Sequence, residues 1–157
     1  MDNYLSILEE SLQKKLQLLD EIQAYNDKQQ QIFSAEQVQI ELFDEAIEEK
    51  GRLVEQVVKL DEGFEKLYEN VAEELKNNRA RYAEQIKRMQ QLVQQVTDKS
   101  VSVQAQEARN KALIEAYFAK EKKQIGQGRR SSTAAYNYYN NARKAASAEP
   151  QFMDSRQ

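Results

Sequence analysis

The sequence predicts an all-α fold, an elongated antiparallel three-helix bundle or coiled-coil-like hairpin with a long third helix and a flexible C-terminal tail. Only four Gly and one Pro occur among the 157 residues, so few positions interrupt regular structure. Glu, Gln, Lys, Leu and Ala fill most of the chain, and these residues lose little side-chain entropy in a helix. No stretch alternates apolar and polar residues as a half-buried strand does, so no sheet is expected.

The first helix is expected from about residue 2 to residue 33. Its core positions recur every three or four residues, which is the helical period. Three of these positions are polar, and they interrupt the apolar stripe. In order, the stripe is Leu5, Leu8, Leu12, Lys15, Leu19, Ile22, Asn26, Gln29 and Phe33. Ser34 is the expected N-cap of the next helix, with Gln37 at the spacing of a capping box.

The second helix carries an apolar face from Leu42 to Leu60. Lys50 falls in the middle of this face, where a long side chain is expected to extend past its neighbours to water. Gly63 marks a weak break, since Gly costs only about 1 kcal/mol against Ala inside a helix. Residues 76–79 are the stronger candidate for a turn. This pattern fits a third helix that is continuous from about Phe64, and it also fits one that begins after a break near Asn77.

The third helix shows apolar residues at helical spacing from Tyr82 to Phe118. Because this stripe extends beyond the partners that the first two helices provide, part of it is a candidate groove for an amphipathic helix of another protein. The alternative is that the stripe packs within the bundle or against a second copy of the chain. The candidate residues for binding a client helix are Leu92, Val93, Val96, Val103, Leu113, Ile114, Tyr117 and Phe118.

Residues 1–122 are therefore assigned to the bundle, and residues 123–157 to a basic, flexible tail. Residues 1–118 carry a net charge of −8, whereas residues 119–147 carry +6. Polar composition with few apolar residues is typical of a segment that does not fold alone. The tail also holds a tyrosine cluster, which suggests a linear recognition motif that orders on binding. Its members are Tyr136, Tyr138 and Tyr139.

The composition also excludes several classes of function. The chain has neither Cys nor His, which removes disulfides, thiolate zinc sites and the commonest general base at neutral pH. The acidic residues recur opposite apolar ones, as on a solvated helix face. We therefore expect no enzyme, no catalytic residue, no metal site and no cofactor.

Nucleic acid is not an expected partner, because seven basic side chains over residues 119–147 are sparser than in a typical nucleic-acid module. No apolar run approaches the ~20 residues that cross a bilayer, so no stable membrane insertion is expected. The first residues show no basic segment followed by an apolar block. A cytoplasmic location is the resulting expectation.

The order of these features resembles the FlgN-type flagellar export chaperones. The similarity begins with residues 4–12 (YLSILEESL), continues through a short turn at Ser34 and Ala35, and includes residues 48–57 (EEKGRLVEQV) in the second helix. A long third helix and a tail that contains Tyr complete it. Such chaperones bind the C-terminal amphipathic helix of hook-associated proteins, which form the hook–filament junction, and keep them unpolymerised in the cytoplasm. They then deliver these clients to the export gate of the flagellar type III secretion system.

The resemblance also implies that a C-terminal Tyr docks at the gate, for which Tyr136, Tyr138 and Tyr139 are the candidates by position and Tyr117 a weaker one. The competing hypothesis is a self-associating structural coiled-coil scaffold with no export role. A chaperone should be a monomer or weak homodimer that binds a guest helix. A scaffold should be a tight oligomer.

Overall fold

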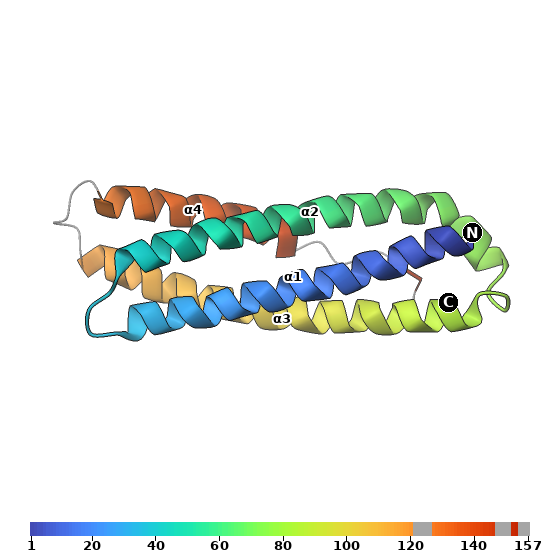
Figure 1. The fold of residues 1–157 in the computed structure, drawn as a ribbon, viewed down its shortest axis with the longest axis horizontal. Helices are drawn as coiled ribbons and strands as arrows, with labels where there is room; N and C mark the ends of the chain where they lie inside the picture. Colours follow the sequence, from blue (N-terminus) through green and yellow to red (C-terminus); the bar gives the residue numbers. More distant parts are fainter. Residues whose placement is uncertain (121–126, 147–151, 154–157) are drawn as a thin grey trace.

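The computed structural model describes residues 1–120, 127–146 and 152–153, and within them it contains four helices and no strand. They are α1 (Asp2–Ser34), α2 (Ile40–Asn77), α3 (Ala83–Lys120) and α4 (Gln127–Ala146). The molecule is an elongated bundle in which α1 and α3 run in one direction and α2 and α4 in the other (Figure 1). The predicted all-α bundle is confirmed.

The helices surround the core in the order α1, α2, α4, α3. α1 packs closely along both α2 and α3, and α4 packs along α2, whereas α4 touches α3 only sparsely. α2 and α3 therefore face each other across the bundle without packing backbone to backbone over the described residues. The seam between α3 and α4 is the loosest side of the molecule.

The first two helices follow the predicted periods, but their junction differs from the prediction. Ser34 is the last residue of α1 and does not cap α2; the chain then extends at Ala35, and Gln39 precedes α2 without a side-chain cap. The capping-box prediction was wrong, because the packing of α1 carries its helix one residue past the expected end. The weak break predicted at Gly63 is absent, because α2 is continuous through that residue.

The predicted turn near Asn77 is present. The amide of Asn78 hydrogen-bonds the carbonyl of Leu75, and its side-chain nitrogen lies 2.8 Å from the carbonyl oxygen of Glu74. These bonds satisfy carbonyl groups at the C-terminal end of α2. The third helix is therefore separate and begins at Ala83.

The main difference from the prediction is α4, which lies where a flexible tail was expected. The predicted three-helix count was wrong, because residues 127–146, which belong to the predicted tail, form a fourth helix that packs on α2. Ala135 and Tyr138 are buried there, and Tyr139 and Ala142 are half-buried, which gives a narrow apolar face at helical spacing. Tertiary contacts of these few side chains outweigh the polar composition.

Beyond α4, Phe152 and Met153 return to the bundle. The Phe152 ring lies 5.1 Å from that of Tyr68 and 6.4 Å from that of Phe64, both on α2. Met153 is buried, and its carbonyl oxygen accepts a hydrogen bond of 3.0 Å from Gln90 of α3. The rest of the predicted tail, residues 123–126, 147–151 and 154–157, lies outside the described residues.

Gly51 offers a direct test of the helix interior of α2. A Cβ atom added there would meet no atom within 4 Å. Gly51→Ala should therefore raise the free energy of unfolding by about 0.5–1 kcal/mol, because Ala loses less backbone entropy than Gly in a helix. Thermal unfolding followed by circular dichroism should show a rise in Tm of about 1–4 °C for a chain of this size. An unchanged or lower Tm would contradict the described environment of this residue.

Candidate helix-binding site

A cluster of buried polar side chains surrounds Lys50 of α2 within the apolar core, and we call it the polar centre. The Lys50 side chain is fully buried, so the prediction that it extends to water was wrong. Its ammonium nitrogen donates to Gln29 Oε1 of α1 at 2.7 Å and to Glu107 Oε2 of α3 at 3.0 Å. A buried ammonium needs such partners, since an unpaired charge in the core is strongly disfavoured. Lys50 thus joins three helices.

Tyr138 adds α4 to the same centre. The Lys50 nitrogen lies 4.3 Å from the centroid of the Tyr138 ring, within the range of a cation–π interaction. The Tyr138 hydroxyl donates to Glu107 Oε1, the carboxylate oxygen that Lys50 does not use. Glu107 therefore accepts from α2 and α4 at once. This pair of contacts is the polar anchor of α4 on the bundle.

Burial shifts the pKa values of Lys50 and Tyr138 in this centre. Desolvation lowers the pKa of Lys50 to about 8, although Glu107 opposes the change through its charge and its hydrogen bond. Desolvation and the neighbouring Glu107 raise the pKa of Tyr138 well above its usual value. The tyrosine stays neutral as a hydrogen-bond donor, while Lys50 begins to lose its proton just above neutral pH.

A second polar layer joins α1 to α3 beside this centre. Asn110 donates to the carbonyl oxygen of Asn26 at 2.9 Å, and Asn26 donates to Gln106 Oε1 at 3.3 Å. Three buried polar atoms nearby lack a hydrogen-bond partner: Asn26 Oδ1, Gln29 Nε2 and the Tyr139 hydroxyl. Each unpaired buried atom costs stability, so the hydrogen bonding of these buried side chains is incomplete.

A cavity of about 350 Å³ adjoins the polar centre. Its walls are mainly apolar, with charged groups at Lys15, Glu107 and Lys111. All four helices contribute, and the sparse contact between α3 and α4 leaves that seam as the side on which the cavity opens. The apolar lining residues are Leu19, Ile22, Val54, Val57, Val103, Ala108 and Ala142, and the two tyrosine rings of α4 complete the wall.

The residues predicted for client binding differ in how deeply they are buried. Val96, Val103 and Ile114 are buried, while Leu92 and Val93 are half-buried against the core. Among the predicted set only Val103 lines the cavity, and only Leu113 is exposed. Most of this stripe therefore packs within the bundle, which was the stated alternative to an exposed groove.

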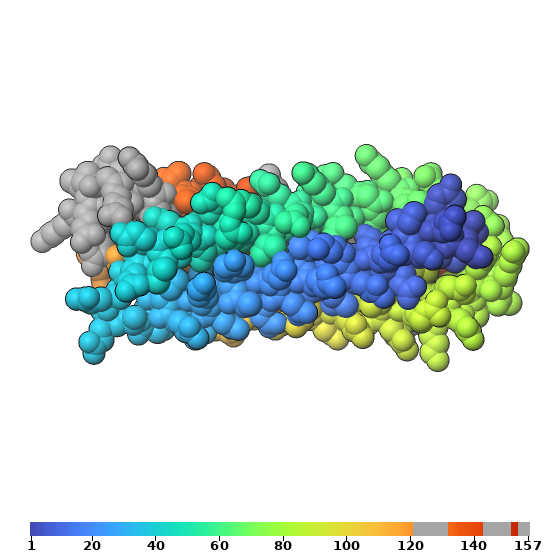
Figure 2. Space-filling model, viewed as in Figure 1, coloured from blue at the N-terminus to red at the C-terminus, as the bar shows by residue number. Residues whose placement is uncertain are grey.

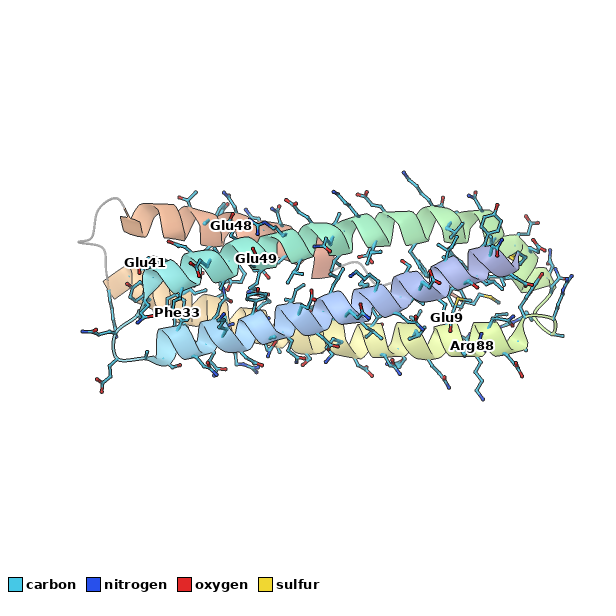
Figure 3. The ribbon with its side chains drawn as sticks, viewed as in Figure 1. Glu9, Phe33, Glu41, Glu48, Glu49 and Arg88 are labelled. Carbon is cyan, nitrogen blue, oxygen red and sulfur yellow. The ribbon has the colours of Figure 1, made fainter. Side chains whose placement is uncertain are left out.

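Tyr117 and Phe118, the last two residues predicted for client binding, lie in an aromatic cluster. Their rings pack at 5.4 Å from Phe33 and 6.2 Å from Phe43, respectively. Figure 3 shows Phe33 at the end of α1 that carries this cluster. These two side chains hold α1, α2 and α3 together at the end where the chain passes from α1 to α2.

The three tyrosines predicted for gate docking also differ in environment. Tyr136 is 68% exposed, Tyr138 is buried in the polar centre and Tyr139 is half-buried beside the cavity. Sequence reasoning did not identify Lys50, Glu107 or Gln29 as a site. The available signal was that polar residues interrupt the apolar stripes of each long helix, at Gln29 and Lys50 in particular.

The remaining chemistry of the described residues is limited. They contain no group of three or more carboxylates that could hold a metal ion. None of the four helices is long and apolar enough, over the part of the chain described, to cross a membrane. The features that stand out are thus an amphipathic helix held on a bundle and a cavity beside it. Comparisons with protein-family models, curated proteins and solved structures found no match to this chain.

Proposed function

We propose that this protein is a cytoplasmic flagellar type III export chaperone. It binds the C-terminal amphipathic helix of hook-associated proteins, prevents their premature assembly and delivers them to the export gate. The order of features along the sequence suggests this family, and a simple physical effect explains how such a chaperone would act on its client. Holding an aggregation-prone helix masks its apolar face by mass action.

The observation that carries the proposal is the way α4 packs on the other helices. The bundle of α1, α2 and α3 accepts an amphipathic helix on its open side through Tyr138 and Ala135, and leaves an apolar cavity along the seam with α3. A groove that holds one amphipathic helix has the shape and chemistry for the apolar face of another. We therefore place the client helix along the α3–α4 seam, with its apolar side chains in the cavity.

Export-gate docking falls to Tyr136 in this proposal. It is the only one of the three candidate tyrosines that is largely exposed. Tyr138 is engaged with Lys50 and Glu107, so it is unavailable to a partner while α4 remains in place. A bound client and an exposed tyrosine on the same helix would let one complex engage two partners.

Calorimetric titration tests the proposal. The full-length chain should bind the C-terminal ~40 residues of a hook–filament junction protein from the same organism with a Kd of about 1 μM or tighter, near −8 kcal/mol. Ala108→Glu places a charge on the exposed rim of the cavity and should weaken binding about tenfold.

Ala116→Glu is the matched control for this titration. Ala116 is also exposed on α3 but does not line the cavity, so its affinity should stay within about twofold of the unmodified chain. No binding of any such segment, together with a tight homo-oligomer, would overturn the chaperone proposal and support the self-associating scaffold.

A further inference from the structure

A second groove lies between α1 and α2, on the side of the bundle opposite the α3–α4 seam. Figure 2 shows this face, with α1 in blue and α2 in teal to green side by side. The groove has a volume of about 580 Å³. It extends from Ile7 to Leu18 on α1 and from Gln56 to Leu67 on α2. At 1.5 Å per residue, each wall is about 17 Å long.

The groove has an apolar floor and an unobstructed middle. Leu8, Leu18 and Phe64 form the buried floor, and Ile7 stands at the edge with half its surface exposed. Gly63 lies on the α2 wall, where an added Cβ atom would meet nothing within 4 Å. The missing side chain lets another backbone approach closely. Ile7, Leu60 and Leu67 keep part of their apolar surface accessible along the groove.

Two lysines lie along the edges of this groove. Lys14 and Lys59 line the groove, and neither makes a hydrogen bond or ion pair with another described residue. The adjacent Lys15 instead turns inward and pairs with Asp61 at 2.7 Å. Glu10 is the single carboxylate in the lining. An acidic body thus presents two ammonium groups, without a partner among the described residues, beside a groove with an apolar floor.

We propose that this groove docks an amphipathic helix of a partner protein whose apolar stripe is flanked by carboxylates. About three helical turns match the length of the walls, with apolar side chains at positions i, i+4 and i+7 over the floor. A small residue of the partner faces Gly63. Carboxylates pair with Lys14 and Lys59. A second copy of this chain fits less well, because its own two lysines would face the same two lysines.

The test uses the full-length chain and two synthetic 18-residue helical peptides. Both carry the same Leu and Ala stripe, flanked in one by Glu and in the other by Lys. Fluorescence anisotropy should show the Glu-flanked peptide binding at least about tenfold more tightly than its Lys-flanked twin. Lys14→Glu combined with Lys59→Glu should reverse this preference. Lys66→Glu with Lys76→Glu, two exposed residues of α2 outside the groove, should leave it unchanged.

Two glycine variants locate the site. Gly63→Gln puts a side chain in the middle of the groove and should weaken the Glu-flanked peptide about tenfold. Gly51→Gln makes the same change in α2 outside the groove and should have no effect. Equal affinity for the two peptides, equal effects of the two glycine variants, or dimerisation through this face in place of peptide binding would each overturn the proposal.

Discussion

Lys50→Met is expected to lower the free energy of unfolding by about 3–5 kcal/mol, the usual cost of removing one partner from a buried ion pair. The change leaves the Glu107 carboxylate with Tyr138 as its remaining hydrogen-bond donor in the centre, and it removes the nearer of the two donors to Gln29 Oε1, leaving Asn110 at 3.4 Å. It also removes the cation over the Tyr138 ring, so α4 loses part of its anchor. Urea unfolding at pH 7 measures the loss.

Two variants separate this effect from a general loss of charge. Lys87→Met changes an exposed lysine and should alter stability by less than about 0.5 kcal/mol. Adding Glu107→Gln to Lys50→Met removes the carboxylate charge that has lost its cation and should recover a substantial part of the loss. A double variant no more stable than Lys50→Met would contradict the pairing described here.

The pH dependence of stability gives an independent check on Lys50. Its pKa of about 8 in the folded chain lies below the ordinary value of 10.5. Between these two values the unfolded chain binds more protons than the folded chain, so this group contributes stability that increases as the pH rises. The difference in unfolding free energy between the unmodified chain and Lys50→Met should therefore widen from pH 8 to pH 10. A constant difference would show that Lys50 titrates normally.

Phe43→Ala is expected to cost about 3–5 kcal/mol, since it removes a large, completely buried aromatic side chain. The Phe43 ring lies 5.0 Å from Phe33 of α1 and 6.2 Å from Phe118 of α3, so the cavity would open where three helices meet. Leu42→Ala is the matched control because Leu42 is 40% exposed, and its cost should stay below about 1 kcal/mol. Similar losses in the two variants would contradict this assignment of the core.

The long helices were predictable because apolar residues recur every three or four positions along their sequences. Leu5, Leu8 and Leu12 mark the buried face of α1, and Asn77 and Asn78 mark the end of α2. α4 was not predictable in this way, since its buried face rests on Ala135 and Tyr138 within a polar segment. Such a helix depends on the groove that receives it, and helix propensity and composition do not encode that groove.

The polar centre was beyond sequence reasoning for a related reason. Lys50 and Glu107 are 57 residues apart, and their pairing depends on how α2 and α3 face each other across the core. The period of each helix shows that a polar residue falls on the buried face, but not which residue of another helix meets it. The same uncertainty affected the client-binding residues, where Val96 and Ile114 share the period of a groove and turn out to lie in the core.

The most direct test of the chaperone proposal is a titration of the full-length chain, with labelled Val and Leu methyl groups, against the C-terminal segment of a hook–filament junction protein. Saturable chemical-shift changes should occur at Val103, Val54 and Leu19, which line the cavity. Leu8 and Leu67 of the α1–α2 groove should not change. The absence of shifts at Val103, Val54 and Leu19 with a saturating client would contradict the proposal that a client helix binds along the α3–α4 seam.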